Sequence, residues 1–142
     1  MKRNDIILIV FLTVASIIGY FSMNYILDAS NVEDGTANVY YNNNLILEIY
    51  LTDGTYEIID SSYILEIDDQ DFLYTVEGSN GPVIIEYINH QVRVIDETSP
   101  KNICQIQGLT SSPLRPITCL PNNIVIVIRA QPNDNLPDII TG

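Results

Sequence analysis

The stretch Asn44–Ile59, which reads NLILEIYLTDGTYEII, decides the fold class of this chain. Apolar residues occupy every second position of its first half, namely Leu45, Leu47, Ile49 and Leu51. A period of two places these side chains on one face of an extended chain, so residues 44–52 are predicted to form a half-buried β-strand. The pair Asp53-Gly54 favours a two-residue hairpin turn, because both positions tolerate positive φ. The stretch therefore predicts a hairpin, with Tyr56–Ile59 as its second strand.

Similar short apolar runs, separated by turn residues, continue along the rest of the chain. We expect further strands at Val39–Tyr41, Tyr63–Ile67, Phe72–Glu77, Val83–Ile88, Gln91–Ile95 and Ile124–Ile128. The last of these is apolar on both faces, which predicts a central strand covered on both sides. No segment after residue 27 has a helical apolar stripe of three or more turns. An all-β domain is therefore expected, as a small closed or nearly closed β-barrel or sandwich of about 7–9 short strands.

The N-terminal stretch Ile6–Leu27 carries no charged residue and predicts one transmembrane α-helix before the β domain. As a helix it would run about 33 Å, which matches a hydrocarbon core of about 30 Å. A cleaved signal peptide is the alternative. Its apolar region is usually about 7–15 residues long and ends at a cleavage site with small residues. The best such site here, after Ala29, has the bulky Leu27 at the −3 position. An uncleaved signal anchor is favoured.

The charges that flank this stretch predict its orientation. Lys2 and Arg3 precede it, and no Lys or Arg follows until Arg93. Because cationic flanks stay in the cytoplasm, we expect a single-pass protein of the cell membrane with its N-terminus inside and its C-terminal domain extracellular. The expected organisation is a cytoplasmic stub at 1–5, a transmembrane helix at 6–27, a tether at 28–36, a β domain at 37–129 and a disordered tail at 130–142.

The chain is strongly acidic, with 18 Asp and Glu against six Lys and Arg and a formal net charge of −12. Such a surface repels phosphate backbones, so nucleic acid is not expected as a partner. The run Asp68-Asp69-Gln70-Asp71 lacks the spaced ligands of a calcium loop and is interpreted as a solvated turn. No metal and no cofactor are expected. The expected partners are the lipid bilayer, through the N-terminal helix, and an unknown envelope or membrane protein.

Cys104 and Cys119 are the only cysteines, and both fall in the domain placed outside the membrane. An even pair in an oxidising compartment predicts a disulfide, which would stabilise the fold by about 3 kcal/mol in the chain-entropy model. The alternative is a sortase-like thiol transpeptidase, with Cys119 as nucleophile assisted by His90 and Arg129. His90 falls in the apparent turn Asn89-His90, and Cys104 is available to oxidise Cys119. The disulfide is therefore favoured, and no catalytic residue is expected.

Two segments resemble the NusG domain II family, namely PVIIEYINHQVRVIDETSPKNICQIQGL at 82–109 and PITCLPNNIVIVI at 116–128. The family pattern runs from Ser/Cys-Pro to a Cys, a Gly and then Cys-Leu-Pro before an apolar strand. It corresponds here to Ser99, Pro100, Cys104, Gly108, Cys119, Leu120 and Pro121. Ser99 stands where many relatives have another Cys, and Leu109 stands where an aromatic residue is frequent.

The resemblance implies a compact β-barrel of complex topology, in which the motif residues are structural. It does not imply transcription elongation, because the other modules of the elongation factor are absent. We therefore expect a non-enzymatic, extracytoplasmic interaction module held at the membrane. One alternative is an accessory protein of a membrane redox or envelope system, in which Cys104 and Cys119 cycle between thiols and disulfide. The sortase-like enzyme is the second alternative.

Overall fold

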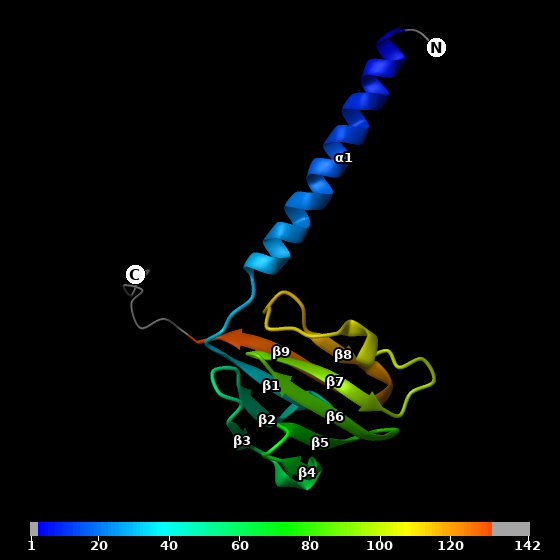
Figure 1. Ribbon diagram of the computed structural model, residues 1–142. Helices are drawn as coiled ribbons and strands as arrows, with labels where there is room; N and C mark the ends of the chain where they lie inside the picture. Colours follow the sequence, from blue (N-terminus) through cyan, green and yellow to red (C-terminus); the bar gives the residue numbers. More distant parts are fainter. Residues whose placement is uncertain (1–2, 132–142) are drawn as a thin grey trace, which may run out of the picture.

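The computed structural model describes residues 3–131, which form one long helix followed by a β domain (Figure 1). Helix α1 spans Arg3–Ala29. The strands are β1 (Gly35–Tyr41), β2 (Asn44–Tyr50), β3 (Tyr56–Ile58), β4 (Ile64–Asp68), β5 (Leu73–Gly78), β6 (Gly81–Ile88), β7 (Gln91–Glu97), β8 (Ile117–Cys119) and β9 (Ile124–Ala130). Three 3-10 turns are interspersed: η1 (Ser61–Tyr63), η2 (Gln105–Gln107) and η3 (Leu120–Asn122).

Helix α1 projects from the β domain (Figure 1). Its large apolar side chains between Ile6 and Ile26 are exposed. By length and composition, Asn4–Ile26 is able to cross a membrane, either as an anchor or as a signal sequence. Its Thr and Ser hydroxyl groups find acceptors on the backbone of the helix itself. Thr13 Oγ1 donates to Ile9 O at 3.0 Å and Ser16 Oγ donates to Leu12 O at 2.8 Å, so both groups are satisfied within the helix.

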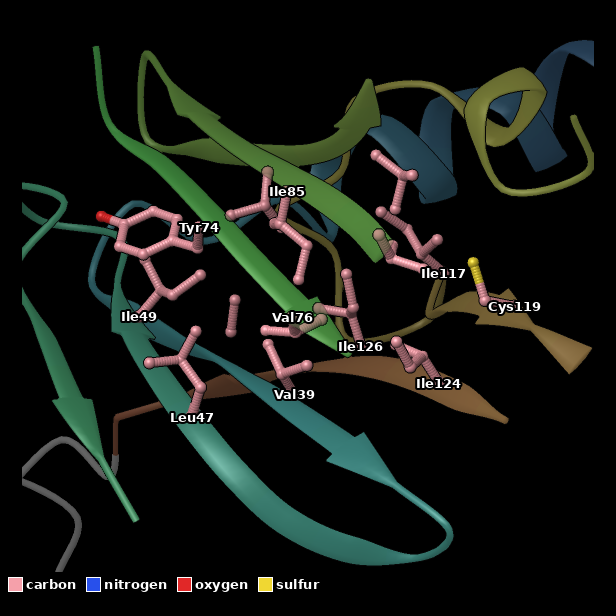
Figure 2. Close-up of a cluster of buried hydrophobic side chains, with 14 of the residues drawn as sticks. Val39, Leu47, Ile49, Tyr74, Val76, Ile85, Ile117, Cys119, Ile124 and Ile126 are labelled. Carbon is pink, nitrogen blue, oxygen red and sulfur yellow. The ribbon is translucent and has the colours of Figure 1, made fainter. Parts of the chain in front are cut away.

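The strands form two antiparallel sheets, one of five strands in the order β3-β2-β1-β9-β8 and one of four in the order β4-β5-β6-β7. No strand of one sheet is hydrogen-bonded to a strand of the other within residues 3–131, so the domain is a sandwich and not a closed barrel. The inner faces share one apolar core (Figure 2). Its large members include Tyr74, Ile46, Leu47, Ile49, Ile85, Ile117, Ile124 and Ile126.

The hairpin predicted from the opening stretch forms, but its details differ. Ile46 and Leu47 are both buried and Leu45 is only half-buried, because Val39 pairs with Leu47 and Tyr40 with Leu45, which leaves Ile46 as an extra residue in β2. The predicted two-residue turn is wrong. Tyr50 N donates to Thr55 O at 2.7 Å, so the loop between these residues is four residues long. The longer loop draws Leu51 into the core.

The other predicted strands form, and the structure adds one that the sequence did not predict. The turns Asn42-Asn43 and Asn89-His90 have positive φ at both residues, as tight hairpins require. Strand β8 has only three residues, too few to show a period of two. Strand β9 is paired on both sides, but Val125 and Val127 on its outer face are half-buried, so the expected cover on both faces is wrong.

The boundaries of the elements also shift. Helix α1 ends at Ala29, beyond the predicted end at residue 27, and β1 already begins at Gly35. The expected tether at 28–36 is therefore reduced to residues 30–34. Strand β9 continues to Ala130, and the rest of the predicted tail, from residue 132 onward, lies outside the described residues.

Candidate functional site: the disulfide-closed segment

The segment between Cys104 and Cys119, here the disulfide-closed segment, covers one open side of the sandwich. On that side β7 and β8 are the edge strands of the two sheets. Thr110 pairs with Val92 of β7 through backbone hydrogen bonds of 2.9 and 3.0 Å. Gln107 exchanges two 2.9 Å hydrogen bonds with the backbone of Thr118 in β8. The segment thus satisfies backbone groups that would otherwise be free on both edges.

The two predicted cysteines fix the ends of this segment. Cys104 and Cys119 are bonded to each other, with Cα atoms 5.2 Å apart, and both side chains are buried. Cys119 ends β8, and Cys104 lies immediately before η2. The bond therefore joins the five-stranded sheet to the loop that leaves β7. Closing a loop of this size restricts the unfolded chain and stabilises the fold by about 3 kcal/mol.

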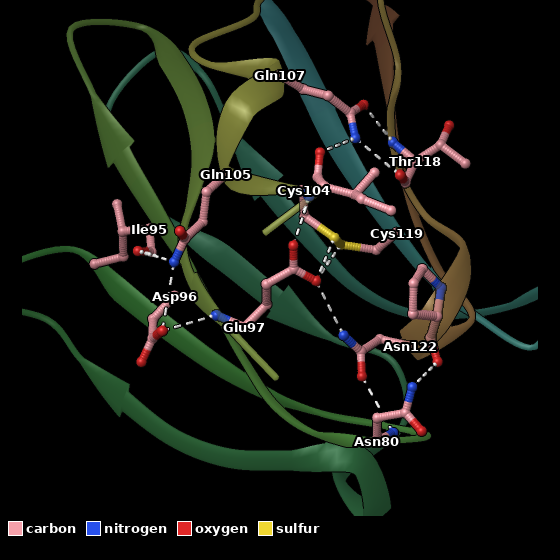
Figure 3. The surroundings of a disulfide bond; sticks show 12 residues. Asn80, Ile95, Asp96, Glu97, Cys104, Gln105, Gln107, Thr118, Cys119 and Asn122 are labelled. Atoms are coloured by element: carbon pink, nitrogen blue, oxygen red, sulfur yellow. Dashed lines mark hydrogen bonds between the residues drawn. A yellow bond between two sulfur atoms is a disulfide. The ribbon is translucent and has the colours of Figure 1, made fainter. Parts of the chain in front are cut away.

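A buried carboxyl group lies beneath the disulfide (Figure 3). Glu97 is only 7% exposed. Its Oε1 accepts a hydrogen bond from Cys104 N at 2.6 Å, and its Oε2 accepts one from Asn122 Nδ2 at 3.2 Å. The same Oε2 lies 2.7 Å from Cys104 Sγ and 3.9 Å from Cys119 Sγ. Glu97 therefore connects the disulfide to η3. Within the described part of the chain, Glu97, Cys104 and Cys119 are the only group of three residues whose potential metal-ligand atoms lie close together.

Glu97 was not identified from the sequence, and a bulge in β7 explains why. A strict period of two from Val92 and Val94 would place Asp96 inside and Glu97 outside. In the pairing between β6 and β7, Ile84 lies opposite Asp96, whereas the next residue of β6 lies opposite Val94. One residue of β7, between Val94 and Asp96, is therefore left without a partner. The extra residue in β7 reverses the faces beyond it, which turns the Glu97 side chain toward the cysteines. A bulge of this kind leaves no signal in a single sequence.

Asn122 ties the Cys-Leu-Pro motif to the opposite sheet. Its side chain is fully buried, and its Oδ1 accepts a hydrogen bond from Asn80 N at 3.1 Å. Asn80 Nδ2 in turn donates to Pro121 O at 2.6 Å. The turn between β5 and β6 is therefore held against η3, which closes the end of the sandwich (Figure 3). The contact at Pro121 is made by its backbone carbonyl.

The remaining motif residues surround this cluster or lie on the surface beside it. Ser99 and Pro100 line an open pocket of about 650 Å³ next to Glu97. The Ser99 hydroxyl is buried and has no hydrogen-bond partner among the described residues. Gly108 ends η2 with a φ of +73°, a conformation that favours glycine. Leu120 is 73% exposed, so its side chain is available for contact with another molecule.

Several large apolar side chains of the disulfide-closed segment and its flanks are exposed. They are Ile103, Ile106, Leu109, Leu114 and Leu120. Ile106 is 76% exposed and Leu114 is 62% exposed, although both lie in a small domain with a well-filled core. Leu114 and Arg115 also border a depression of about 410 Å³. The backbone of the segment is constrained by the disulfide, and its surface is apolar. Exposed apolar patches of this kind are typical of interaction surfaces.

The disulfide-closed segment lies directly beside the end of helix α1 (Figure 1). Val32 N donates to Ser111 O at 3.0 Å, and the hydroxyl groups of Ser30 and Ser112 are hydrogen-bonded to each other. The residues that follow the helix are therefore attached to the loop that carries Leu114. Whatever surrounds the helix end also lies near this loop.

The sortase-like constellation is not assembled. His90 occupies the β6–β7 turn, where its Nδ1 lies 2.8 Å from Leu51 O. Cys119 is next to Glu97, at the other end of β7, and seven strand residues span about 23 Å. Arg129 donates to Tyr40 Oη at 2.9 Å on the five-stranded sheet. The geometry thus separates the three groups that a thiol transpeptidase would need together.

Comparison with known proteins agrees with this architecture. The family model of NusG domain II matches residues 7–132. The crystal structure of the Lin0431 protein from Listeria innocua is 20% identical, with a TM-score of 0.53, and covers 70% of this chain and 99% of its own. A DUF1312 family protein from Enterococcus faecalis is 22% identical, with a TM-score of 0.52, and covers 69% and 99%. No curated protein matches this chain.

Proposed function

Since the chain belongs to the NusG domain II family, we propose that it is a membrane-anchored, extracytoplasmic interaction module without catalytic activity of its own. The observation that carries the proposal is the exposed apolar surface of the disulfide-closed segment next to helix α1. The partner is another membrane or envelope protein. Such a partner reaches this surface beside the helix, close to the bilayer.

Several features support the anchor and its orientation. Helix α1 is long enough to span a hydrocarbon core, and the family match begins within it, at residue 7. Lys2 and Arg3 are the only basic residues that precede Arg93, which favours a cytoplasmic N-terminus. Shaving intact cells with an impermeant protease tests this arrangement. The β domain should be lost while the helix stays in the membrane fraction; a fully protected β domain would reverse the orientation.

The interaction surface is tested by photo-crosslinking in intact cells. A photoreactive residue placed at Leu114 or at Ile106 should join the chain to the same discrete membrane or envelope protein. Glu77, an exposed position on β5, serves as the matched control and should give no such product. Crosslinks to lipid alone, or equal products from all three positions, would contradict a dedicated protein-binding surface.

A second candidate function is the redox accessory, and Glu97 is the observation that favours it. With Oε2 at 2.7 Å from Cys104 Sγ, its carboxylate is placed to accept the proton of a Cys104 thiol when the pair is reduced. A dithiol donor would transfer two electrons and two protons, becoming a disulfide itself while Cys104 and Cys119 become thiols. Burial of both sulfurs weighs against this function, because an attacking thiolate must reach one of them.

The state of the thiols in intact cells separates the two functions. Maleimide labelling before and after a strong reductant, read as a gel shift, reports how many cysteines are free. A pair that stays fully closed in growing and in respiration-inhibited cells supports the interaction module. A reduced fraction that changes with the respiratory state would favour the redox accessory, and Glu97→Gln should then alter that fraction.

A further inference from the structure

The other open side of the sandwich, between the edge strands β3 and β4, holds a small aromatic pocket. Its volume is about 290 Å³, and it is lined by Gly54, Thr55, Tyr56, Asp69 and Phe72. Ligand pockets for drug-sized molecules begin at about 300 Å³, so this one suits a single side-chain head group. It lies on the side opposite the disulfide-closed segment and shares no residue with it.

The aromatic walls of this pocket are held in place from behind. The rings of Phe72 and Tyr87 meet edge to face, with centroids 5.6 Å apart, and those of Tyr56 and Tyr74 do the same at 5.6 Å. Gly54 permits this packing, because a Cβ there would lie 2.6 Å from the Tyr87 ring and 2.8 Å from the Phe72 ring. The walls are therefore preorganised by close packing, and no side chain has to move far to form them.

Phe72 adopts a backbone conformation that bulky residues rarely adopt. Its φ is +54°, in the left-handed region, and its side chain is 39% exposed. A left-handed conformation at a residue with a Cβ costs about 1–2 kcal/mol. Burial of a partly exposed ring offsets less of this cost than burial of a ring in the core would. The conformation turns the ring toward Gly54 and into the pocket wall. Strained residues of this kind are found at binding sites more often than elsewhere.

Carboxylates flank the rings. Burial, and after it the charge of nearby Asp69, raises the pKa of the Tyr56 phenol. On the other side, Asp53 Oδ1 accepts hydrogen bonds from Thr55 N at 3.0 Å and from Thr55 Oγ1 at 2.6 Å. These bonds lower the pKa of Asp53, so the group is ionised at neutral pH. One of these carboxylates, Asp69, lines the pocket, and the other, Asp53, is hydrogen-bonded to the lining residue Thr55.

Within residues 3–131, neither Asp53 nor Asp69 takes part in a salt bridge. Eleven carboxylates lie between Glu33 and Glu77, and no Lys or Arg occurs between Arg3 and Arg93. The one ion pair among residues 3–131 joins Arg93 to Glu86, on other strands. An aromatic wall with an adjacent carboxylate and no resident cation is complementary to an organic cation, which gains from the π faces and from the charge.

We propose that this pocket binds the guanidinium or ammonium head group of a basic polypeptide. Asp69 contacts the charge, and the rings of Tyr56 and Phe72 contact its flat or alkyl parts. The polypeptide runs past the edge of β3, which pairs with β2 on one side only. This site is distinct from the apolar surface of the disulfide-closed segment, so the chain presents two surfaces of opposite character.

The test uses the full chain in non-ionic detergent micelles and a short blocked peptide with one central Arg. The matched ligand carries citrulline in its place, which has the same shape without the charge. The aromatic NMR signals of Tyr56 and Phe72 should shift with the Arg peptide and not with the citrulline peptide. Choline chloride is the third arm; binding of choline equal to that of the Arg peptide would assign the site to small organic cations instead of a polypeptide.

Two variants locate the interaction. Asp69→Asn should weaken binding of the Arg peptide about fivefold, whereas Asp71→Asn, in the same acidic turn but outside the pocket, should change it less than twofold. Phe72→Leu keeps an apolar side chain but removes the π face, and should weaken binding about threefold. Equal losses from Asp69→Asn and Asp71→Asn would show diffuse attraction and overturn the proposal. So would the absence of any shift at 10 mM, roughly the weakest affinity expected for one such contact.

This experiment is independent of the proposed function. It requires neither the anchor orientation nor a protein partner at Leu114. If the Arg peptide does not bind, the crosslinks expected from Leu114 and Ile106 are unaffected. If no crosslinks form, the expected result of the peptide titration is unaffected. Thermal melts of the Asp69→Asn and Phe72→Leu variants should match the unmodified chain within a few degrees, which separates lost binding from lost folding.

Discussion

The two open sides of the sandwich are treated differently by this chain. On the β7/β8 side, the disulfide-closed segment covers both sheet edges, and Gln107 and Thr110 satisfy their backbone groups. On the β3/β4 side, the short connection through η1 passes from one sheet to the other, and the edge strands carry the acidic residues Glu57, Glu66 and Asp68. Sheet edges are aggregation hazards unless they are covered or charged. In this chain, the sheet edges are covered by a segment on the β7/β8 side and carry acidic side chains on the β3/β4 side.

The difference also separates two kinds of rigidity. The covered side depends on a covalent bond and on buried polar groups in contact with it. The charged side depends on aromatic packing around Gly54, which leaves a pocket open to solvent. Changes to the two sides should therefore differ in size and in how far their effects spread.

The largest effect is expected from the double change Cys104→Ser and Cys119→Ser. Removing the bond restores freedom to the unfolded chain, so the free energy of unfolding should fall by about 3 kcal/mol in urea titrations. Amide exchange should accelerate in β8 and η2 and stay unchanged in β3 and β4 under native conditions. A loss below about 1 kcal/mol, or equal acceleration on both sides, would contradict the assignment of the bond to the covered side.

A smaller loss is expected from Glu97→Gln. The new amide can still accept from Cys104 N, but its NH₂ group then faces the donor Asn122 Nδ2, and one buried hydrogen bond is lost. An unsatisfied buried group costs about 1–3 kcal/mol. Urea unfolding should show a loss of about that size, while the control Glu66→Gln, exposed on β4, should change stability by less than about 0.5 kcal/mol. Equal effects of the two changes would mean that the Glu97 contacts contribute little.

The smallest effect concerns pH and belongs to the charged side. Burial, and after it the charge of Asp69, raises the pKa of Tyr74 above its ordinary value of 10.0. The unfolded phenol loses its proton first, so this group's stabilisation is complete below pH 10 and declines as the pH rises above it. The urea concentration at the midpoint of unfolding should therefore decrease as the pH is raised from 9 to 11.5. Tyr74→Phe should flatten that decline, while Tyr40→Phe, at a half-buried position of β1, should not.

Much of the fold follows from local patterns. The Asn42-Asn43 and Asn89-His90 turns, and the strands around them, form where the sequence predicts, because turn residues and a period of two are local properties. The cysteines and the motif around Pro121 were also identified in advance. The parts that were missed depend on register. Glu97 faces inward only because β7 carries a bulge, and the Asp53-Gly54 loop is longer than predicted because Tyr50 pairs with Thr55.

The aromatic pocket was not predictable for a related reason. Its residues come from a loop and from the turns beside two different strands, and they meet only because the sheets stack. Tyr56 and Asp69 are separated by the whole of η1 and β4, and nothing in the spacing of an isolated Tyr and an isolated Asp marks them as neighbours. An acidic turn in a sequence is therefore compatible with a solvated surface or with a binding site, and only the packing distinguishes the two.

The short connection between α1 and β1 limits where the domain can work. Only residues 30–34 separate the two elements, and fully extended they would reach about 17 Å. Two of them are also hydrogen-bonded to the disulfide-closed segment. For a chain anchored as proposed, the domain stays within one domain diameter of the bilayer and diffuses with it. Its partners are then met by a search in two dimensions, along the membrane plane, and not by reaching outward through the envelope.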